Sequence, residues 1–126
     1  MSMMHVLDDH DATLVRTLCE LMVPGSGRVW PEVYIDALLA RMPQEDRSAT
    51  LAAFAALAPV ATSPESLSAR AFTGEFMLVR AFACDAFYSD FLAPGAPGPS
   101  AYAEIDFTLP LAARIKKDWS YLGVTS

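Results

Sequence analysis

Apolar residues recur at spacings of three and four along residues 11–91, which is the pattern of amphipathic helices. The first stripe predicts a helix from about Asp11 to Val23, and the acidic residues at positions 8, 9 and 11 favour its N-terminus. The turn sequence PGSG at 24–27 ends this helix. Its apolar positions are Leu14, Val15, Leu18, Cys19, Leu21 and Met22.

Two further helices are predicted between residues 31 and 58. The second helix follows Trp30, because Pro31 suits a first helical position and Pro43 stops the stripe. The third covers PQEDRSATLAAFAALA at 43–58, with acidic residues near its start. We expect the second helix to bury Ile35, Leu38, Leu39 and Met42, and the third to bury Leu51, Phe54, Ala55 and Ala58.

The segment TSPES at 62–66 is another helix start, with Ser63 as the cap and Pro64 at the first position. A long apolar helix is predicted within residues 72–91, either capped by Thr73 or bent at Gly74. A helix that is apolar nearly all round is buried on several sides. It is therefore either the centre of a bundle or in contact with a partner on one side. One face would carry Phe76, Val79, Ala83 and Phe87, and the rest Met77, Leu78, Phe82, Ala86 and Phe91.

The pattern changes at APGAPGP, residues 93–99, where Pro and Gly exclude a regular element. The following AYAEIDFTL, residues 101–109, alternates apolar and polar positions and predicts an extended segment. Without a second strand, such an arm has to lie on a helical surface or on another protein. Pro110 then begins a predicted short helix with Leu111, Ile115 and Trp119 along one side.

These elements predict an all-α fold, a small bundle of four or five helices with an extended Pro-rich C-terminal arm and a short terminal helix. The bundle would take residues 1–92 and the arm and aromatic tail residues 93–126, within one domain. A chain of 126 residues suits one domain. Hydrophobic residues make up 53% of it, so some apolar surface is expected to be exposed or covered by a partner.

The net charge of −6 disfavours binding to nucleic acid, and the basic group Arg114, Lys116 and Lys117 is too small to follow a phosphate backbone. No apolar run reaches the roughly 18 to 20 residues that cross a bilayer. The N-terminus MSMMHVLDDHD has neither a secretory pattern nor a twin-arginine pair. The sequence therefore predicts a cytoplasmic chain without a membrane span, unless a partner carries it elsewhere.

Candidate catalytic and metal-ligating residues do not combine into a recognised motif. His5 and His10 lie among aspartates and are interpreted as a solvated terminus and helix cap rather than a metal site. Cys19 and Cys84 are interpreted as buried thiols, with a disulfide between neighbouring helices as an alternative. Ser26 in PGSGR does not follow a strand, as a nucleophile elbow would. The sequence predicts no catalytic residue, cofactor site or metal site in this chain.

Charged and aromatic residues give the remaining signals. Arg80 and Asp85 interrupt the apolar helix and are expected to be paired, solvated or in contact with a partner. Aromatic residues of the arm and tail suit interface anchors, although the tail folding back over its own bundle explains them equally well. The candidate partner-binding residues are Tyr88, Tyr102, Phe107, Trp119, Tyr121 and Leu122.

The order of LCELMVPGSG, YIDALLARM, FACDAFYSDF and PLAARIKKDWSYLGV resembles the gluconate 2-dehydrogenase subunit 3 family. The most specific parts are MVPG at 22–25 and DWSYLG at 118–123. The resemblance implies a small helical subunit that accompanies a large FAD-dependent dehydrogenase of the glucose–methanol–choline type. It also implies that flavin and catalytic residues belong to that large subunit. Many members carry a twin-arginine export signal, which this chain lacks.

We therefore expect a non-catalytic accessory subunit of an FAD-dependent oxidoreductase that acts on a sugar, glycoside or related alcohol. A stand-alone helical interaction module or a homodimer is the alternative. A small enzyme in its own right is the third hypothesis.

Overall fold

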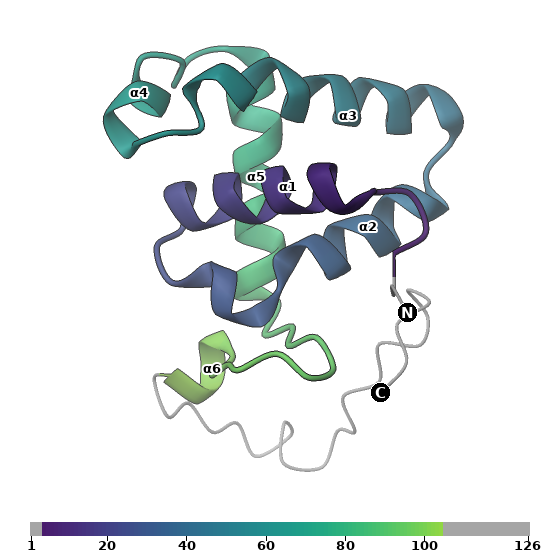
Figure 1. Cartoon of the computed structure of the whole chain (residues 1–126), viewed down its shortest axis with the longest axis vertical. Coiled ribbons are helices and arrows are strands. Elements are labelled where there is room, and N and C mark those ends of the chain that lie inside the picture. The colour runs from purple at the N-terminus through teal and green to yellow at the C-terminus, as the bar shows by residue number, and fades with distance from the viewer. Residues whose placement is uncertain (1–3, 105–126) are drawn as a thin grey trace.

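The computed structural model describes residues 4–104, and this part of the chain folds into helices without a strand (Figure 1). The predicted all-α fold class is confirmed. The two 3₁₀ helices are η1 (Ser26–Val29) and η2 (Ala58–Val60). The α-helices are α1 (Asp9–Met22), α2 (Pro31–Arg41), α3 (Gln44–Leu57), α4 (Pro64–Ser68), α5 (Gly74–Tyr88) and α6 (Ala101–Glu104).

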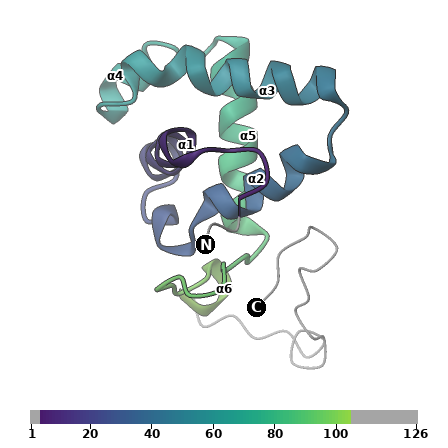
Figure 2. The same cartoon turned by 45° about the vertical axis from the view of Figure 1, so that its right-hand side comes forward.

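Helix α5 is the centre of the arrangement, with α1, α2 and α3 packed against it (Figures 1 and 2). It contributes buried Val79, Ala83 and Phe87 to the core, and small side chains such as Ala83 allow close helix contacts. Apolar side chains of α5 also lie outside its buried face. Helices α1 and α2 contribute further members of the core, among them Val15, Leu18, Cys19, Ile35 and Leu39.

The residues that start helices α2, α4 and α5 were predicted correctly from the sequence. Pro31 begins α2 and Pro64 begins α4, each at a position whose backbone lacks a helical partner. The Ser63 hydroxyl accepts from the Ser66 N–H, and the Thr73 hydroxyl accepts from the Phe76 N–H. Thr73 is thus the N-cap of α5 rather than part of a longer bent helix.

The predicted inner face of α3 was partly wrong. Phe54 is buried as expected, but Ala55 and Ala58 are exposed and Leu51 is half-buried. The buried positions are instead Thr50, Ala53, Phe54 and Leu57. Thr50 can be buried because its hydroxyl donates to the Asp46 carbonyl at 2.8 Å, which leaves no unsatisfied donor.

The predicted extended segment was wrong at its beginning, because Ala101–Glu104 forms the short helix α6. Residues 93–100 do lack regular structure, and their backbone is bound to η1. The Ala93 N–H donates to the Val29 carbonyl at 3.1 Å, and the Gly98 N–H donates to the Arg28 carbonyl at 3.0 Å. The first part of the arm therefore packs on its own chain. The rest of the predicted extended segment and the short helix from Pro110 lie outside the described residues.

Candidate interaction surface

The outer face of α5 exposes large apolar side chains. Met77 is 62% exposed, Tyr88 60% and Leu78 37%. Met77, Ala81, Asp85 and Tyr88 follow one another at spacings of four, four and three, so they share one face of the helix, with Leu78 beside them. We call Met77, Leu78, Ala81, Asp85 and Tyr88 the α5 strip. Contiguous exposed apolar surface on a small protein is typical of a protein-interaction site.

The sequence left open whether α5 is central or meets a partner on one side. The structure shows α5 at the centre of the helices, with one side of it exposed. Three helices cover its inner face, while the strip is open to solvent. Phe72, two residues before α5 begins, is 98% exposed and adds a large apolar group near the start of the helix. The exposed apolar surface expected from the composition is therefore present in the described part of the chain.

The charged residues of α5 have different surroundings. Asp85 is exposed, yet its carboxylate accepts a hydrogen bond of 2.7 Å from the Tyr34 hydroxyl of α2. Arg80 is exposed on the surface of α5. Surface exposure was one of the predicted alternatives for both residues. The bond to Tyr34 holds Asp85 at the centre of the strip.

Two of the six predicted partner-binding residues, Tyr88 and Tyr102, lie in the described part of the chain. Tyr88 lies in the α5 strip, with its ring 5.3 Å from that of Phe87 in an edge-on arrangement. Tyr102 is half-buried in α6 against the core, and its N–H donates to the Asp90 carboxylate at 2.9 Å. The other four residues lie outside the described part of the chain, namely Phe107, Trp119, Tyr121 and Leu122.

Two buried carboxylates on α2 were missed by the sequence reasoning. Asp36 is 1% exposed and accepts three backbone N–H groups, from His5, Val6 and Leu7, at 2.7 to 2.8 Å. A carboxylate that accepts successive backbone N–H groups forms a strong, charge-assisted set of hydrogen bonds. This set fixes the segment before α1 on α2, although both histidines nearby, His5 and His10, are exposed.

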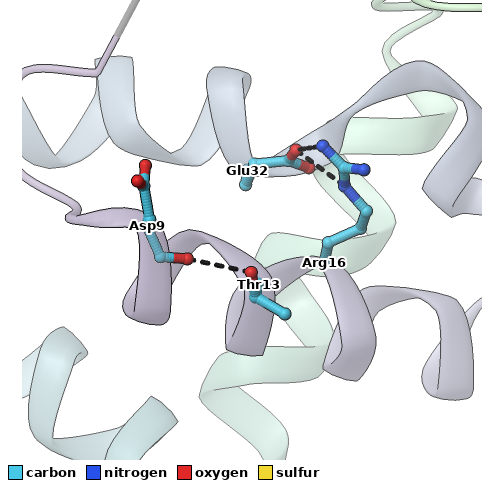
Figure 3. A network of polar contacts seen from close by, with 4 residues as sticks. All are labelled: Asp9, Thr13, Arg16 and Glu32. Carbon is cyan, nitrogen blue, oxygen red and sulfur yellow. Dashed lines mark hydrogen bonds and ion pairs between the residues drawn. The ribbon is translucent and has the colours of Figure 1, made fainter. Parts of the chain in front are cut away.

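Glu32, one helical turn before Asp36, is the second buried carboxylate (Figure 3). Arg16 of α1 donates from Nε to Glu32 Oε2 at 2.7 Å and from Nη2 to the same oxygen. This hydrogen bond raises the pKa of the Arg16 guanidinium, which also lies 5.7 Å from the centre of the Trp30 ring. The pair joins α1 to α2. The four-residue spacing of two acidic residues within an apolar helix was the signal that could have revealed these sites.

The candidate nucleophiles Ser26, Cys19 and Cys84 are buried or half-buried in the fold. The buried Ser26 hydroxyl donates to the Cys19 carbonyl at 2.8 Å, as a second hydrogen bond beside the one from the Val23 N–H. Cys19 and Cys84 are both free thiols, buried and half-buried respectively. Burial raises the pKa of the Cys19 thiol, and electrostatic interactions with Glu32 and Cys84 raise it further. Cys19 therefore remains protonated at neutral pH and is a poor nucleophile.

The raised pKa of Cys19 predicts a loss of stability in alkali. The folded state holds the thiol proton more tightly than the unfolded state, so stability is full below the unfolded pKa of about 8.5 and falls above it. The fall approaches about 1.4 kcal/mol per pH unit, or about 2 kcal/mol at pH 10. Urea unfolding at pH 7.5 and pH 10 measures it.

Cys19→Ala should remove this part of the pH dependence, and Cys84→Ala serves as the matched control that retains it. Lysine and tyrosine titrations are common to all three proteins and cancel in the comparison. An equal decrease for wild type and Cys19→Ala would show that Cys19 ionises as easily in the folded chain as in the unfolded one.

Residues 4–104 contain no group of three His, Cys, Asp or Glu side chains placed to hold a metal ion. Among the helices of this range, none is both long and apolar enough to cross a membrane. Comparison of the chain with protein-family models, with curated proteins and with solved structures gives no match. In the described part of the chain, the exposed surface of α5 is therefore the feature that most directly suggests a function.

Proposed function

We propose that this chain is a non-catalytic accessory subunit of a large FAD-dependent oxidoreductase of the glucose–methanol–choline type, acting on a sugar, glycoside or related alcohol. Its role is to bind and stabilise the large subunit, which holds the flavin and the catalytic residues. We propose the cytoplasm as the location of this assembly, unless the partner directs its export.

The α5 strip is the single observation that carries the proposal. Met77 and Tyr88 present large side chains to solvent from the most central helix of the fold. Tyrosine and methionine are enriched at protein interfaces, where their apolar area becomes buried. The pairing of Asp85 with Tyr34 fixes a polar group between these side chains, which suits a specific rather than a purely apolar contact.

The nature of the partner is proposed from the sequence resemblance. MVPG at 22–25 and DWSYLG at 118–123 are the motifs that support it. In the described part, Val23 is buried and the Val23 N–H donates to the Cys19 carbonyl, so MVPG forms the end of α1. We propose Tyr102, Phe107, Trp119, Tyr121 and Leu122 as further contacts with the large subunit, in addition to Tyr88.

Exchange of apolar groups on the α5 strip should weaken the complex without unfolding the chain. Met77→Glu and Tyr88→Ser are each expected to lower affinity for the large subunit at least tenfold, equivalent to about 1.4 kcal/mol. Stability should change by no more than about 0.5 kcal/mol, because both side chains are largely exposed. Titration calorimetry and urea unfolding measure the two quantities.

The control for these variants is Ala49→Glu, which places the same charge at an exposed position of α3. Equal weakening by Ala49→Glu would indicate a general charge effect. Unchanged affinity in Met77→Glu and Tyr88→Ser together would exclude the strip as the docking surface.

A second prediction concerns the C-terminal motif. Trp119→Ala is expected to weaken association with the large subunit more than it lowers the free energy of unfolding. Equal losses of affinity and stability would instead make Trp119 part of the core of its own chain.

A homodimer is the second candidate function, and the same exposed strip favours it. Isologous pairing of two α5 strips would bury the apolar groups of both copies. Light scattering of the isolated chain separates the two cases. A stable, monodisperse dimer that does not bind the large subunit would favour the homodimer.

A further inference from the structure

Helix α5 carries a row of solvent-accessible residues at the spacing that paired helices use. In a heptad abcdefg that begins at Gly74, positions a and d are occupied by Gly74, Met77, Ala81, Cys84 and Tyr88. We call these five residues the α5 seam, which shares three members with the α5 strip. Cys84 is half-buried and the other four are exposed. Three of the four buried residues of α5 fall at positions c and f, on the opposite side of the helix.

Opposite charges flank the α5 seam. Arg80 lies at position g on one side, and Asp85 lies at the following position e on the other side. Both side chains are exposed. Among residues 4–104, Arg80 forms no hydrogen bond or ion pair through its side chain. Asp85 accepts from the Tyr34 hydroxyl through one carboxylate oxygen, so its other oxygen can accept from a cation.

This arrangement of charges is complementary to itself when two copies of α5 run parallel. In a parallel pair of helices, a g residue meets the e residue of the next heptad on the other helix. Arg80 of one copy then lies beside the partner's Asp85, and the two-fold symmetry forms this contact twice. In an antiparallel pair, e lies beside e and g beside g, so residues of like charge share each side and neither ion pair forms.

We infer that the isolated chain forms a parallel two-fold dimer through the α5 seam, with Arg80 of each copy paired to the partner's Asp85. Small residues at two of the a positions, Gly74 and Ala81, allow the helices to approach closely. A Cβ atom at Gly74 would meet nothing within 4 Å in the described structure, so a second helix has room there.

The dimer is expected to be weak. The seam spans about 21 Å from Gly74 to Tyr88 at 1.5 Å per residue, which is only two heptads. A contact of this size suits a transient dimer with a Kd of about 50 µM. The inference concerns the chain without a large subunit and does not rest on the proposed function. The second copy and the large subunit compete for the same face of α5.

Exchange of the two charges tests the pairing. Sedimentation equilibrium at low salt gives the dimer Kd of the full-length wild type, Arg80→Asp, Asp85→Arg and the double variant. Each single substitution sets like charges against each other at both contacts and should raise the Kd at least tenfold. The double variant restores opposite charges and should return to within about threefold of the wild type. Arg41→Asp is the matched control, because Arg41 is exposed on α2, away from the seam.

Cys84 gives a second readout that leaves the charges of the wild type unchanged. It occupies a d position, so in a parallel pair the two Cys84 thiols face each other across the two-fold axis. Diamide should therefore link the wild-type chains through a disulfide that Cys84→Ala cannot form. Arg80→Asp should form it at least tenfold more slowly, because fewer chains are paired. This readout holds even if Asp85→Arg fails to fold after losing the bond to Tyr34.

Three results would overturn the inference. The first is a wild-type chain that stays monomeric up to about 1 mM, far above the expected Kd. The second is a dimer whose Kd is unchanged in both single variants, which would place the contact on another surface. The third is a folded double variant that remains as weak as the single variants, which would exclude parallel pairing of Arg80 with Asp85.

Discussion

Replacement of Asp36 by alanine is expected to lower the free energy of unfolding by about 3 kcal/mol. The carboxylate is buried on α2 and accepts from three successive backbone N–H groups, those of His5, Val6 and Leu7. Hydrogen bonds to a charged group contribute roughly 1.5 to 3 kcal/mol each. The total loss is smaller than the sum, because the freed N-terminal segment can move into water and regain hydrogen bonds there.

Urea unfolding measures the loss, and amide hydrogen exchange locates it. The amides of Val6 and Leu7 should lose protection in Asp36→Ala, whereas the amides of α5 lose it only through global unfolding. Asp46→Ala is the control, since Asp46 is an exposed aspartate in the first turn of α3. Retained protection of Val6 and Leu7 in Asp36→Ala would show that other contacts hold the segment.

Breaking the ion pair between α1 and α2 should have the next largest effect. Arg16→Met is expected to lower the free energy of unfolding by about 2 to 3 kcal/mol, because Glu32 is then buried without its cation. This loss of stability is at or below the lower end of the range for breaking a fully buried ion pair, because the Arg16 side chain is 48% exposed and water can reach the site. Glu32 Oε1 already lacks a hydrogen-bond partner in the described structure, which makes the carboxylate sensitive to this loss.

A double-mutant cycle separates the pair from the other contacts of Arg16. Glu32→Gln removes the negative charge at nearly constant volume, so adding Arg16→Met to it should cost less than Arg16→Met alone. The remaining cost reports on the packing of Arg16 over the Trp30 ring. Additive effects of the two substitutions would mean that the ion pair contributes nothing to stability.

The helix starts could be predicted because their signals are local. Pro31, Ser63 and Thr73 act on backbone groups within one turn, so a few neighbouring residues determine the outcome. The order of the longer helices followed from apolar spacing for the same reason. This local information was sufficient for the all-α fold class.

The faces of the helices were harder to predict. On α3, alanines occupy both buried and exposed positions and do not indicate which side is buried. Packing against α5 determines which face of α3 is buried. Thr50 can lie on that face because its hydroxyl donates a hydrogen bond within its own helix. Alternation at 101–109 predicted an extended segment, but α6 forms at 101–104 with the Tyr102 N–H bound to distant Asp90.

The hydrogen-bond partners of the buried acids could not be predicted from the sequence. Asp36 accepts hydrogen bonds from backbone N–H groups that lie 29 to 31 residues earlier in the sequence, and every residue except proline carries such a group. No side-chain pattern in the sequence therefore identifies its partners. The α5 strip, in contrast, was partly predictable, since an apolar helix with more than one apolar face has to meet something on its second side. Tyr88 as a partner contact stays a prediction.

Co-expression with a large FAD-dependent dehydrogenase of the glucose–methanol–choline type, the proposed partner, tests the central claim most directly. Size-exclusion chromatography with light scattering and flavin absorbance gives the mass and the flavin content of each peak. The account predicts one yellow peak that contains both chains, with Met77→Glu dividing it into two. Separate elution of the wild-type chains, with a large subunit that is soluble and fully active alone, would contradict it.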